Sequence, residues 1–218
     1  MQSTLIRRFL SVGVLALGVS AVAGCSMFSP SNPRYEPVPL TEYQAAVSAG
    51  VSWSVSVGRD GGAGFAPQVV GESVYAAAPN GSVMKVALAT GAIQWRSEAG
   101  KDLSAGVGSD GRVTAVAARD GTVIAFDEQG REKWQAKASS QVDIPPAVGA
   151  GIVAVRSSDY RIQAFDAETG EALWNVQRPG PALALKTNMR MVIIEDMLLS
   201  GLPNGRLIAI DADSGAVQ

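Results

Sequence analysis

The stretch RIQAFDAETGEALW, residues 161–174, decides the fold. It starts with an alternating apolar segment, turns between Asp166 and Gly170, and ends on Trp174. Apolar alternation on both sides of a glycine-containing turn is typical of a β-hairpin. Glycine supplies the positive φ that a tight reversal needs, and Asp and Thr side chains can hydrogen-bond the turn backbone. The stretch therefore predicts two antiparallel strands.

The same pattern is repeated along the chain. It recurs as VMKVALATGAIQW at 83–95, as VIAFDEQGREKW at 123–134 and as LIAIDADSGAVQ at 207–218. The repeat tryptophans are Trp53, Trp95, Trp134 and Trp174, at intervals of 42, 39 and 40 residues. Such a period indicates stacked units of several strands each. The last copy stops before its tryptophan position, so we expect the repeat to continue beyond Gln218 as part of a longer chain.

Each repeat can be divided into four short strands. The predicted strands are 67–70, 73–77, 83–88 and 92–97 in the first complete repeat, and 103–108, 112–118, 123–127 and 131–136 in the second. Asn80-Gly81 and Asp120-Gly121 are strong two-residue hairpin signals at matching places, whereas Ser158-Asp159-Tyr160 is a weaker turn. The sequence predicts an all-β protein, a β-propeller of four-stranded antiparallel blades, with about three complete blades and one partial blade here.

The four repeat tryptophans have an expected structural role. Each falls at the same point of the fourth strand, where a large flat side chain can pack between neighbouring blades. The alternative is that the indoles stack on a ligand. Residues repeated in every blade usually stabilise the blade, which favours the structural interpretation.

The first 24 residues have the pattern of a signal peptide. Arg7 and Arg8 precede an apolar run that is too short to span a membrane comfortably and that ends in small residues. The run ends in Val-Ala-Gly-Cys, with Cys25 as the only cysteine in the chain. This ending resembles the lipobox of bacterial lipoproteins, which implies diacylglycerol and acyl modification of Cys25. The alternative is an ordinary signal peptide that ends near a free cysteine.

Residues 25–49 are expected to connect the lipid anchor to the folded part. Prolines recur through 26–40, which favours an extended tether, and Thr41 with Gln44 could cap a short helix at 41–49. The β-propeller is expected to occupy 50–218. Residues 51–57, VSWSVSV, alternate like a strand without preceding strands. We expect this strand to pair with the last blade and close the ring, the alternative being a degenerate first repeat.

Composition excludes several functional classes. The chain has no histidine and a single cysteine, which argues against most zinc sites, cysteine nucleophiles and redox dithiols. There are 18 Lys and Arg against 20 Asp and Glu, and without Arg7 and Arg8 the balance is 16 against 20, a net charge of −4. A duplex nucleic-acid binder normally needs a basic face, so we expect no nucleic-acid partner. We expect no metal site, no cofactor and no catalytic residue.

One segment departs from the repeat. Residues 177–191, QRPGPALALKTNMRM, make the fourth interval longer than the two before it. Repeat proteins place such insertions in loops, often on the binding face. Leu183, Leu185 and Lys186 form its alternating apolar and cationic part. The alternative is that the two leucines are inward-facing strand residues.

Lipobox, proline-rich tether, lone first strand and PQQ-type repeats together resemble the BamB family of outer-membrane assembly lipoproteins. The resemblance covers the whole chain and implies an eight-bladed propeller on the periplasmic face of the outer membrane. It implies binding to the POTRA domains of BamA within the BAM complex, contact with the other BAM subunits, and help to nascent outer-membrane proteins by strand addition. Family members contact BamA through a Leu-x-Leu-Arg stretch, which Leu183, Leu185 and Lys186 match with Lys in place of Arg.

Two other functions share the repeat. PQQ-dependent quinoprotein dehydrogenases resemble a larger propeller with calcium-binding carboxylates, and many have a vicinal cysteine pair that this chain does not contain. A propeller lipoprotein that binds a ligand in its central channel is the other alternative. Fold alone does not decide among the three.

Overall fold

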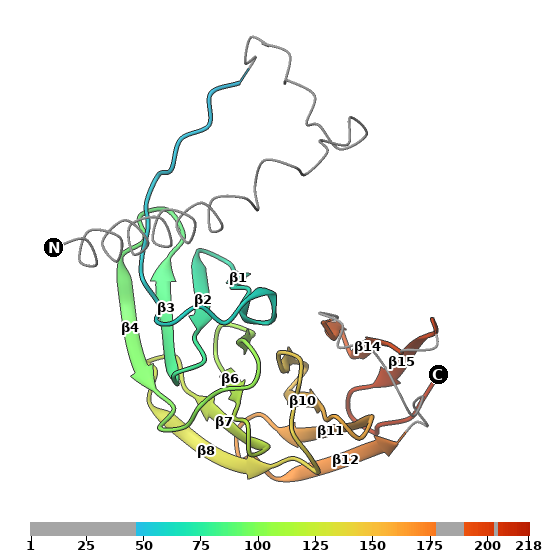
Figure 1. Cartoon of the computed structure of the whole chain (residues 1–218). Helices are drawn as coiled ribbons and strands as arrows, with labels where there is room; N and C mark the ends of the chain where they lie inside the picture. The colour runs from blue at the N-terminus through green and yellow to red at the C-terminus, as the bar shows by residue number, and fades with distance from the viewer. Residues whose placement is uncertain (1–46, 178–189, 203–204) are drawn as a thin grey trace, which may run out of the picture. The chain divides into compact units, whose positions relative to one another are not determined.

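The computed structural model describes residues 47–177, 190–202 and 205–218 (Figure 1). The chain divides into two compact units, residues 1–49 and 50–218. Only 47–49 of the first unit are described, and they are not helical. The rest of the helix expected at 41–49 lies outside the described residues.

The second unit is built from four antiparallel sheets, each formed by consecutive strands. Sheet 1 contains β1 (Gln68–Val70), β2 (Ser73–Ala77), β3 (Ser82–Ala87) and β4 (Ile93–Glu98). Sheet 2 contains β5 (Gly108–Ser109), β6 (Thr114–Ala117), β7 (Thr122–Phe126) and β8 (Glu132–Lys137). Sheet 3 contains β9 (Ala147–Gly149), β10 (Ile152–Arg156), β11 (Arg161–Asp166) and β12 (Ala172–Gln177), and sheet 4 contains β13 (Val192–Ile194), β14 (Met197–Gly201) and β15 (Leu207–Asp211).

The sheets are arranged as the blades of a β-propeller. The first strands of successive sheets lie side by side, β1 with β5, β5 with β9 and β9 with β13. The fourth strands, β4, β8 and β12, lie at the opposite edge of their sheets (Figure 1). Three four-stranded blades and one with three strands confirm the predicted fold class.

The core consists of the layers between successive sheets. One buried cluster joins sheets 1 and 2, a second joins sheets 2 and 3, and a third joins sheets 3 and 4. Because sheet 2 is covered on both faces, every residue of β6 and β7 is buried. This is why the sequences of these two strands are continuous apolar runs, whereas a strand with one exposed face alternates between apolar and polar residues.

The tight turns explain the strand boundaries. Gly81 (φ 97°) and Gly121 (φ 81°) occupy left-handed positions between β2 and β3 and between β6 and β7. Tyr160 takes the corresponding position between β10 and β11 with a φ of 62°. The Asp159 side chain accepts a hydrogen bond from the Arg161 amide, at 3.3 Å, in this turn without glycine. Seven of the eight strands predicted for the first two sheets begin and end within two residues of the observed bounds.

The eighth prediction, a strand at 103–108, is wrong. The strand β5 is limited to Gly108–Ser109, and Leu103 forms only an isolated bridge with Ala118. The apolar residues before β5 belong to a buried connection between sheets 1 and 2. The backbone amides of this connection form hydrogen bonds with other segments of the chain. The Leu103 amide donates to the Pro79 carbonyl, and the Gly106 amide donates to the Gly64 carbonyl, both at 2.9 Å.

Residues 51–57 form no strand pair with the described residues. Every second residue of this segment nevertheless packs against sheet 1. Trp53, Val55 and Val57 lie against a buried cluster of β2 and β3 side chains on the face of sheet 1 that points away from sheet 2. Arg96 of β4 donates to the Ser56 carbonyl at 2.7 Å. The segment therefore covers sheet 1 in the same way that a fourth strand covers the next sheet elsewhere in the chain.

Candidate binding face and inter-sheet junctions

Each repeat tryptophan lies against a glycine of the sheet that follows it in the chain: Trp95, Trp134 and Trp174 lie between two sheets, and Trp53 lies between the unpaired segment 51–57 and sheet 1. The pairs are Trp53 with Gly91, Trp95 with Gly130, Trp134 with Gly170, and Trp174 with Gly215. A Cβ atom at any of these glycines would lie 2.6 or 2.7 Å from an indole carbon. All four glycines also have φ between 70° and 78°. Glycine is therefore required there both by the turn and by the close approach of the ring.

A β-bulge precedes three of the tryptophans. The pairing register shifts at Lys85/Val86, Ala125/Phe126 and Ala164/Phe165, always opposite the residue just before the tryptophan. A bulge inserts one residue and changes the direction in which the next side chain points. Each of these three repeats therefore contains the same local distortion beside its indole.

The indole N–H groups reveal one irregular junction. Trp53 donates to the Leu88 carbonyl at 2.8 Å, Trp134 to Ala167 at 3.0 Å and Trp174 to Ala212 at 2.8 Å. Trp95 Nε1 is buried and has no hydrogen-bond partner among the described residues. The turn facing Trp95, Asp-Glu-Gln-Gly at 127–130, is one residue shorter than the turns that the other three indoles face.

The aspartates that begin these turns organise the backbone. Asp166 accepts hydrogen bonds from the Thr169 amide at 2.7 Å and from the Glu168 amide at 2.9 Å. Asp211 accepts from the Ser214 hydroxyl at 2.6 Å and its amide at 2.8 Å. Bonds of this kind favour the ionised carboxylate, so those from Thr169 lower the pKa of Asp166 and those from Ser214 lower the pKa of Asp211.

The opposite end of the sheets, which we call the loop face, carries the turns 78–81, 118–121 and 157–160 and the connections 99–107 and 138–146. β12 ends on this face, because Gln177 pairs with Arg161 next to the β10–β11 turn. The chain is described again from Arg190. The predicted docking residues Leu183, Leu185 and Lys186 lie outside the described residues, as does Cys25.

Two arginines join segments that are far apart in the sequence. Arg156, at the end of β10, donates to the Gly201 carbonyl of sheet 4 at 2.8 Å, and burial lowers its pKa. Arg190 donates to the Ala66 carbonyl at 2.6 Å. Sequence reasoning missed both residues. The position of Arg156 directly after the apolar run IVAV was the available signal, since a cation that ends a buried strand needs a partner.

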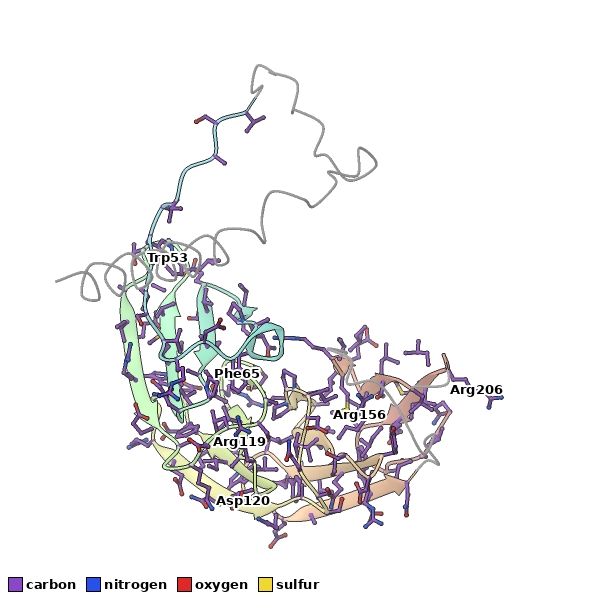
Figure 2. The ribbon with its side chains drawn as sticks, viewed as in Figure 1. Trp53, Phe65, Arg119, Asp120, Arg156 and Arg206 are labelled. Atoms are coloured by element: carbon purple, nitrogen blue, oxygen red, sulfur yellow. The ribbon has the colours of Figure 1, made fainter. Side chains whose placement is uncertain are left out.

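A paired charge cluster lies on the loop face between sheets 1 and 2. Lys101 contacts Asp120 at 2.8 Å, and Lys137 lies 3.5 Å from the same carboxylate. The hydrogen bond from Lys101 is the main reason that the pKa of Asp120 is far below its usual range. Figure 2 labels Asp120 together with Arg119, the neighbouring residue of the same turn.

Neither a metal-ligand cluster nor a membrane-spanning helix is found among the described residues. No three of their Cys, Asp and Glu side chains are grouped so that they could hold a metal ion. No helix in the described part of the chain is both long and apolar enough to cross a membrane.

Comparisons with known proteins agree with this architecture. A family model described as outer membrane protein assembly factor BamB matches residues 79–218. Curated proteins of that name are 55% identical over 94% of this chain in Bordetella pertussis and 39% identical over 97% in Burkholderia pseudomallei. The matches cover 53% and 55% of those relatives, so this chain spans about half their length.

Solved structures show the same fold at lower identity. BamB from Moraxella catarrhalis superimposes with a TM-score of 0.65 at 23% identity, covering 77% of this chain and 51% of that one. A europium-containing methanol dehydrogenase gives a TM-score of 0.60 at 19% identity, covering 77% of this chain and 43% of that one. These identities establish a common fold only, whereas the family model matches most of the chain. The chain belongs to the BamB family of outer membrane protein assembly factors.

Proposed function

We propose that this protein is a non-catalytic scaffold of the machinery that assembles β-barrel proteins in the outer membrane. It acts on the periplasmic face, held by lipid on Cys25, and binds the POTRA domains of BamA through Leu183, Leu185 and Lys186. Membership of the family supports the assembly role. The anchor and the docking contact rest on the sequence patterns around these four residues.

The observation that carries the proposal is the contrast between the repeated and the unrepeated parts of the chain. The residues that recur in each repeat, the tryptophans and turn glycines, are used to join one sheet to the next. Residues 177–191 break the repeat. Arg156 joins sheet 3 to sheet 4, which precede and follow this stretch in the sequence, and Arg190 joins the segment before β13 to the segment before β1. In repeat proteins, binding sites usually lie in the segments that depart from the repeat rather than in the residues that repeat.

Lipid attachment gives the scaffold its location. Each buried CH₂ of an acyl chain contributes about 0.8 kcal/mol, so several chains on Cys25 would hold the protein durably at a membrane. The tether 26–49 then separates the folded unit from the lipid. We expect the partners, which are BamA, the other BAM subunits and nascent outer-membrane proteins, at the periplasmic face of the outer membrane.

A quinoprotein dehydrogenase is the second candidate, because such enzymes share the blade fold. Enzyme activity requires the cofactor and calcium, so adding PQQ and Ca²⁺ to the complete protein and following dye reduction tests it. The scaffold proposal expects no dye reduction above a control without protein. Turnover that depends on the protein would contradict the proposal.

The docking contact is tested by binding of the complete protein to purified BamA POTRA domains. We expect Leu183→Asp combined with Leu185→Asp to weaken binding at least roughly tenfold, because two apolar contacts are lost and two charges are buried. Leu173→Asp is the matched control, since Leu173 is an exposed leucine on β12, at the opposite edge of sheet 3 from β9.

Lys186 tests the polar half of the contact. Lys186→Ala should weaken binding, and Lys186→Arg should preserve or strengthen it, because arginine adds a planar fork to the same charge. Circular dichroism must show that each variant is folded. Undiminished binding by the folded double aspartate variant would remove residues 183–186 from the interface, and absence of binding by the wild type would contradict the BamA assignment.

A further inference from the structure

A cleft of about 550 Å³ opens on the loop face at the junction of sheets 1 and 2. Its walls come from the segment before β1, the β2–β3 turn, the connection before β5 and the β6–β7 turn. Its lining includes Arg59, Asp60, Phe65, Pro79, Asp102 and Arg119. The volume lies within the range of about 300–1,000 Å³ that is typical of ligand sites.

The apolar wall of the cleft is formed before any ligand arrives. The Phe65 amide donates to the Gly62 carbonyl at 3.0 Å, and the Gly62 amide donates to an Asp60 oxygen at 2.8 Å. The Phe65 ring packs against the buried cluster between sheets 1 and 2. A Cβ atom at Gly61 would lie 2.3 Å from that ring and 2.7 Å from Pro79. Such tight packing fixes the wall in place.

The cationic groups of the cleft have no partners among the residues that the structure describes. Neither the Arg59 guanidinium nor the Arg119 guanidinium forms a hydrogen bond or an ion pair there. The backbone of Arg119 is nevertheless fixed, because its amide donates to the Asp102 carbonyl at 2.9 Å. The next residue, Asp120, is held by Lys101. Asp120 beside the cleft is thus paired, whereas the Arg59 and Arg119 guanidiniums have no partner among the described residues; Figure 2 labels Arg119 and Asp120.

The charge balance indicates which anion fits. Arg59 and Arg119 are offset by Asp60 and Asp102, so the cleft has no formal net charge from its side chains. A phosphate dianion would face two carboxylates as well as two guanidiniums. A single carboxylate can take a planar guanidinium fork, and an adjacent apolar group can lie on Phe65 and Pro79. A carboxylate and an adjacent apolar group occur together in a protein segment that has an acidic residue next to an apolar one.

We propose that this cleft binds an extended peptide segment of a partner protein that carries a carboxylate side chain next to an apolar one. Arg59 and Arg119 receive the carboxylate, and Phe65 with Pro79 receives the apolar side chain. The cleft is lined by residues between Arg59 and Arg119, whereas 177–191 connect sheet 3 to sheet 4 in the sequence, so the proposal does not depend on BamA docking.

The test uses the complete protein and a fluorescein-labelled, amidated peptide, Gly-Ala-Glu-Leu-Ala-Gly, followed by fluorescence anisotropy. We expect saturable binding that weakens roughly tenfold when Glu in the peptide is replaced by Gln, because a charge-assisted hydrogen bond is lost. Arg59→Gln combined with Arg119→Gln should cause a similar loss. Arg112→Gln is the matched control, since Arg112 is an exposed arginine at the other end of β6.

A charge exchange makes the test specific. Arg119→Glu should lose the Glu peptide and gain affinity for the peptide with Lys at that position. Absence of binding by the wild type, equal binding of the Glu and Gln peptides, or full binding by the folded double Gln variant would each overturn the proposal. Displacement of the peptide by millimolar inorganic phosphate would show a general anion site instead, and displacement by phosphatidylglycerol vesicles but not phosphatidylcholine vesicles would show a lipid-binding surface.

Discussion

At the scale of single residues, the junction glycines carry two constraints that can be separated experimentally. Gly170 has a φ of 76°, and a Cβ atom there would lie 2.6 Å from the Trp134 ring. Gly151 has a φ of 78°, but a Cβ atom there would meet nothing within 4 Å. The two positions therefore share the backbone strain that alanine would suffer and differ in the steric overlap.

We predict that Gly170→Ala lowers the free energy of unfolding by roughly 2–4 kcal/mol, because left-handed strain adds to overpacking against the indole. Gly151→Ala should cost only about 1 kcal/mol, from the strain alone. Urea denaturation of the complete protein, followed by tryptophan fluorescence, measures both values. Equal losses in the two variants would show that the indole yields to the added methyl group and that the close approach is not a constraint.

At the scale of elements, turn length decides whether a junction is satisfied. The indoles of Trp53, Trp134 and Trp174 each reach a carbonyl in the facing turn, and that of Trp95 does not. The facing turn at 127–130 has one residue fewer than its counterparts. A buried donor without a partner costs stability, so the Trp95 indole N–H is an unsatisfied group at this junction.

Insertion of Thr between Gln129 and Gly130 would restore the common turn length. We predict that it raises the free energy of unfolding by about 1 kcal/mol, because a carbonyl can then accept from Trp95 Nε1. In a Trp95→Phe background the gain should disappear, since phenylalanine has no N–H to satisfy. A double-mutant cycle from four denaturation curves isolates this coupling. A gain that persists in the Trp95→Phe background would assign the effect to the turn itself.

The elements also show what sequence could and could not predict. Period, turn glycines and alternation predicted the sheets, because each signal is local. The strand at 103–108 was predicted wrongly. Its apolar residues are buried, but its backbone amides donate hydrogen bonds to Pro79 and Gly64, which are remote in sequence, instead of pairing with a neighbouring strand. The roles of Arg156 and Arg190 were missed for the same reason. The short turn was visible in the sequence, but its effect on Trp95 required the neighbouring sheet.

At the scale of the whole folded unit, each sheet is expected to be stabilised mainly by its contacts with the adjacent sheets. Each buried cluster joins two adjacent sheets, and the one between sheets 2 and 3 includes Trp134, which is only 8% exposed. Trp53 is more exposed and covers the outer face of sheet 1. In such an array the total stability is close to a sum over sheets and junctions. The position of a junction in the array should therefore decide how many sheets are destabilised when the contacts of that junction are removed.

We predict that Trp134→Ala costs about 3–5 kcal/mol and speeds amide hydrogen exchange in both β7 and β10, because it removes a buried aromatic between two sheets. Trp53→Ala should cost less and affect chiefly β2 and β3, whose side chains its segment covers. Hydrogen exchange read by mass spectrometry on the complete protein distinguishes the patterns. If Trp53→Ala accelerated exchange in β10 as strongly as in β3, the sheets would open as one unit, and stability would belong to the whole propeller rather than to its junctions.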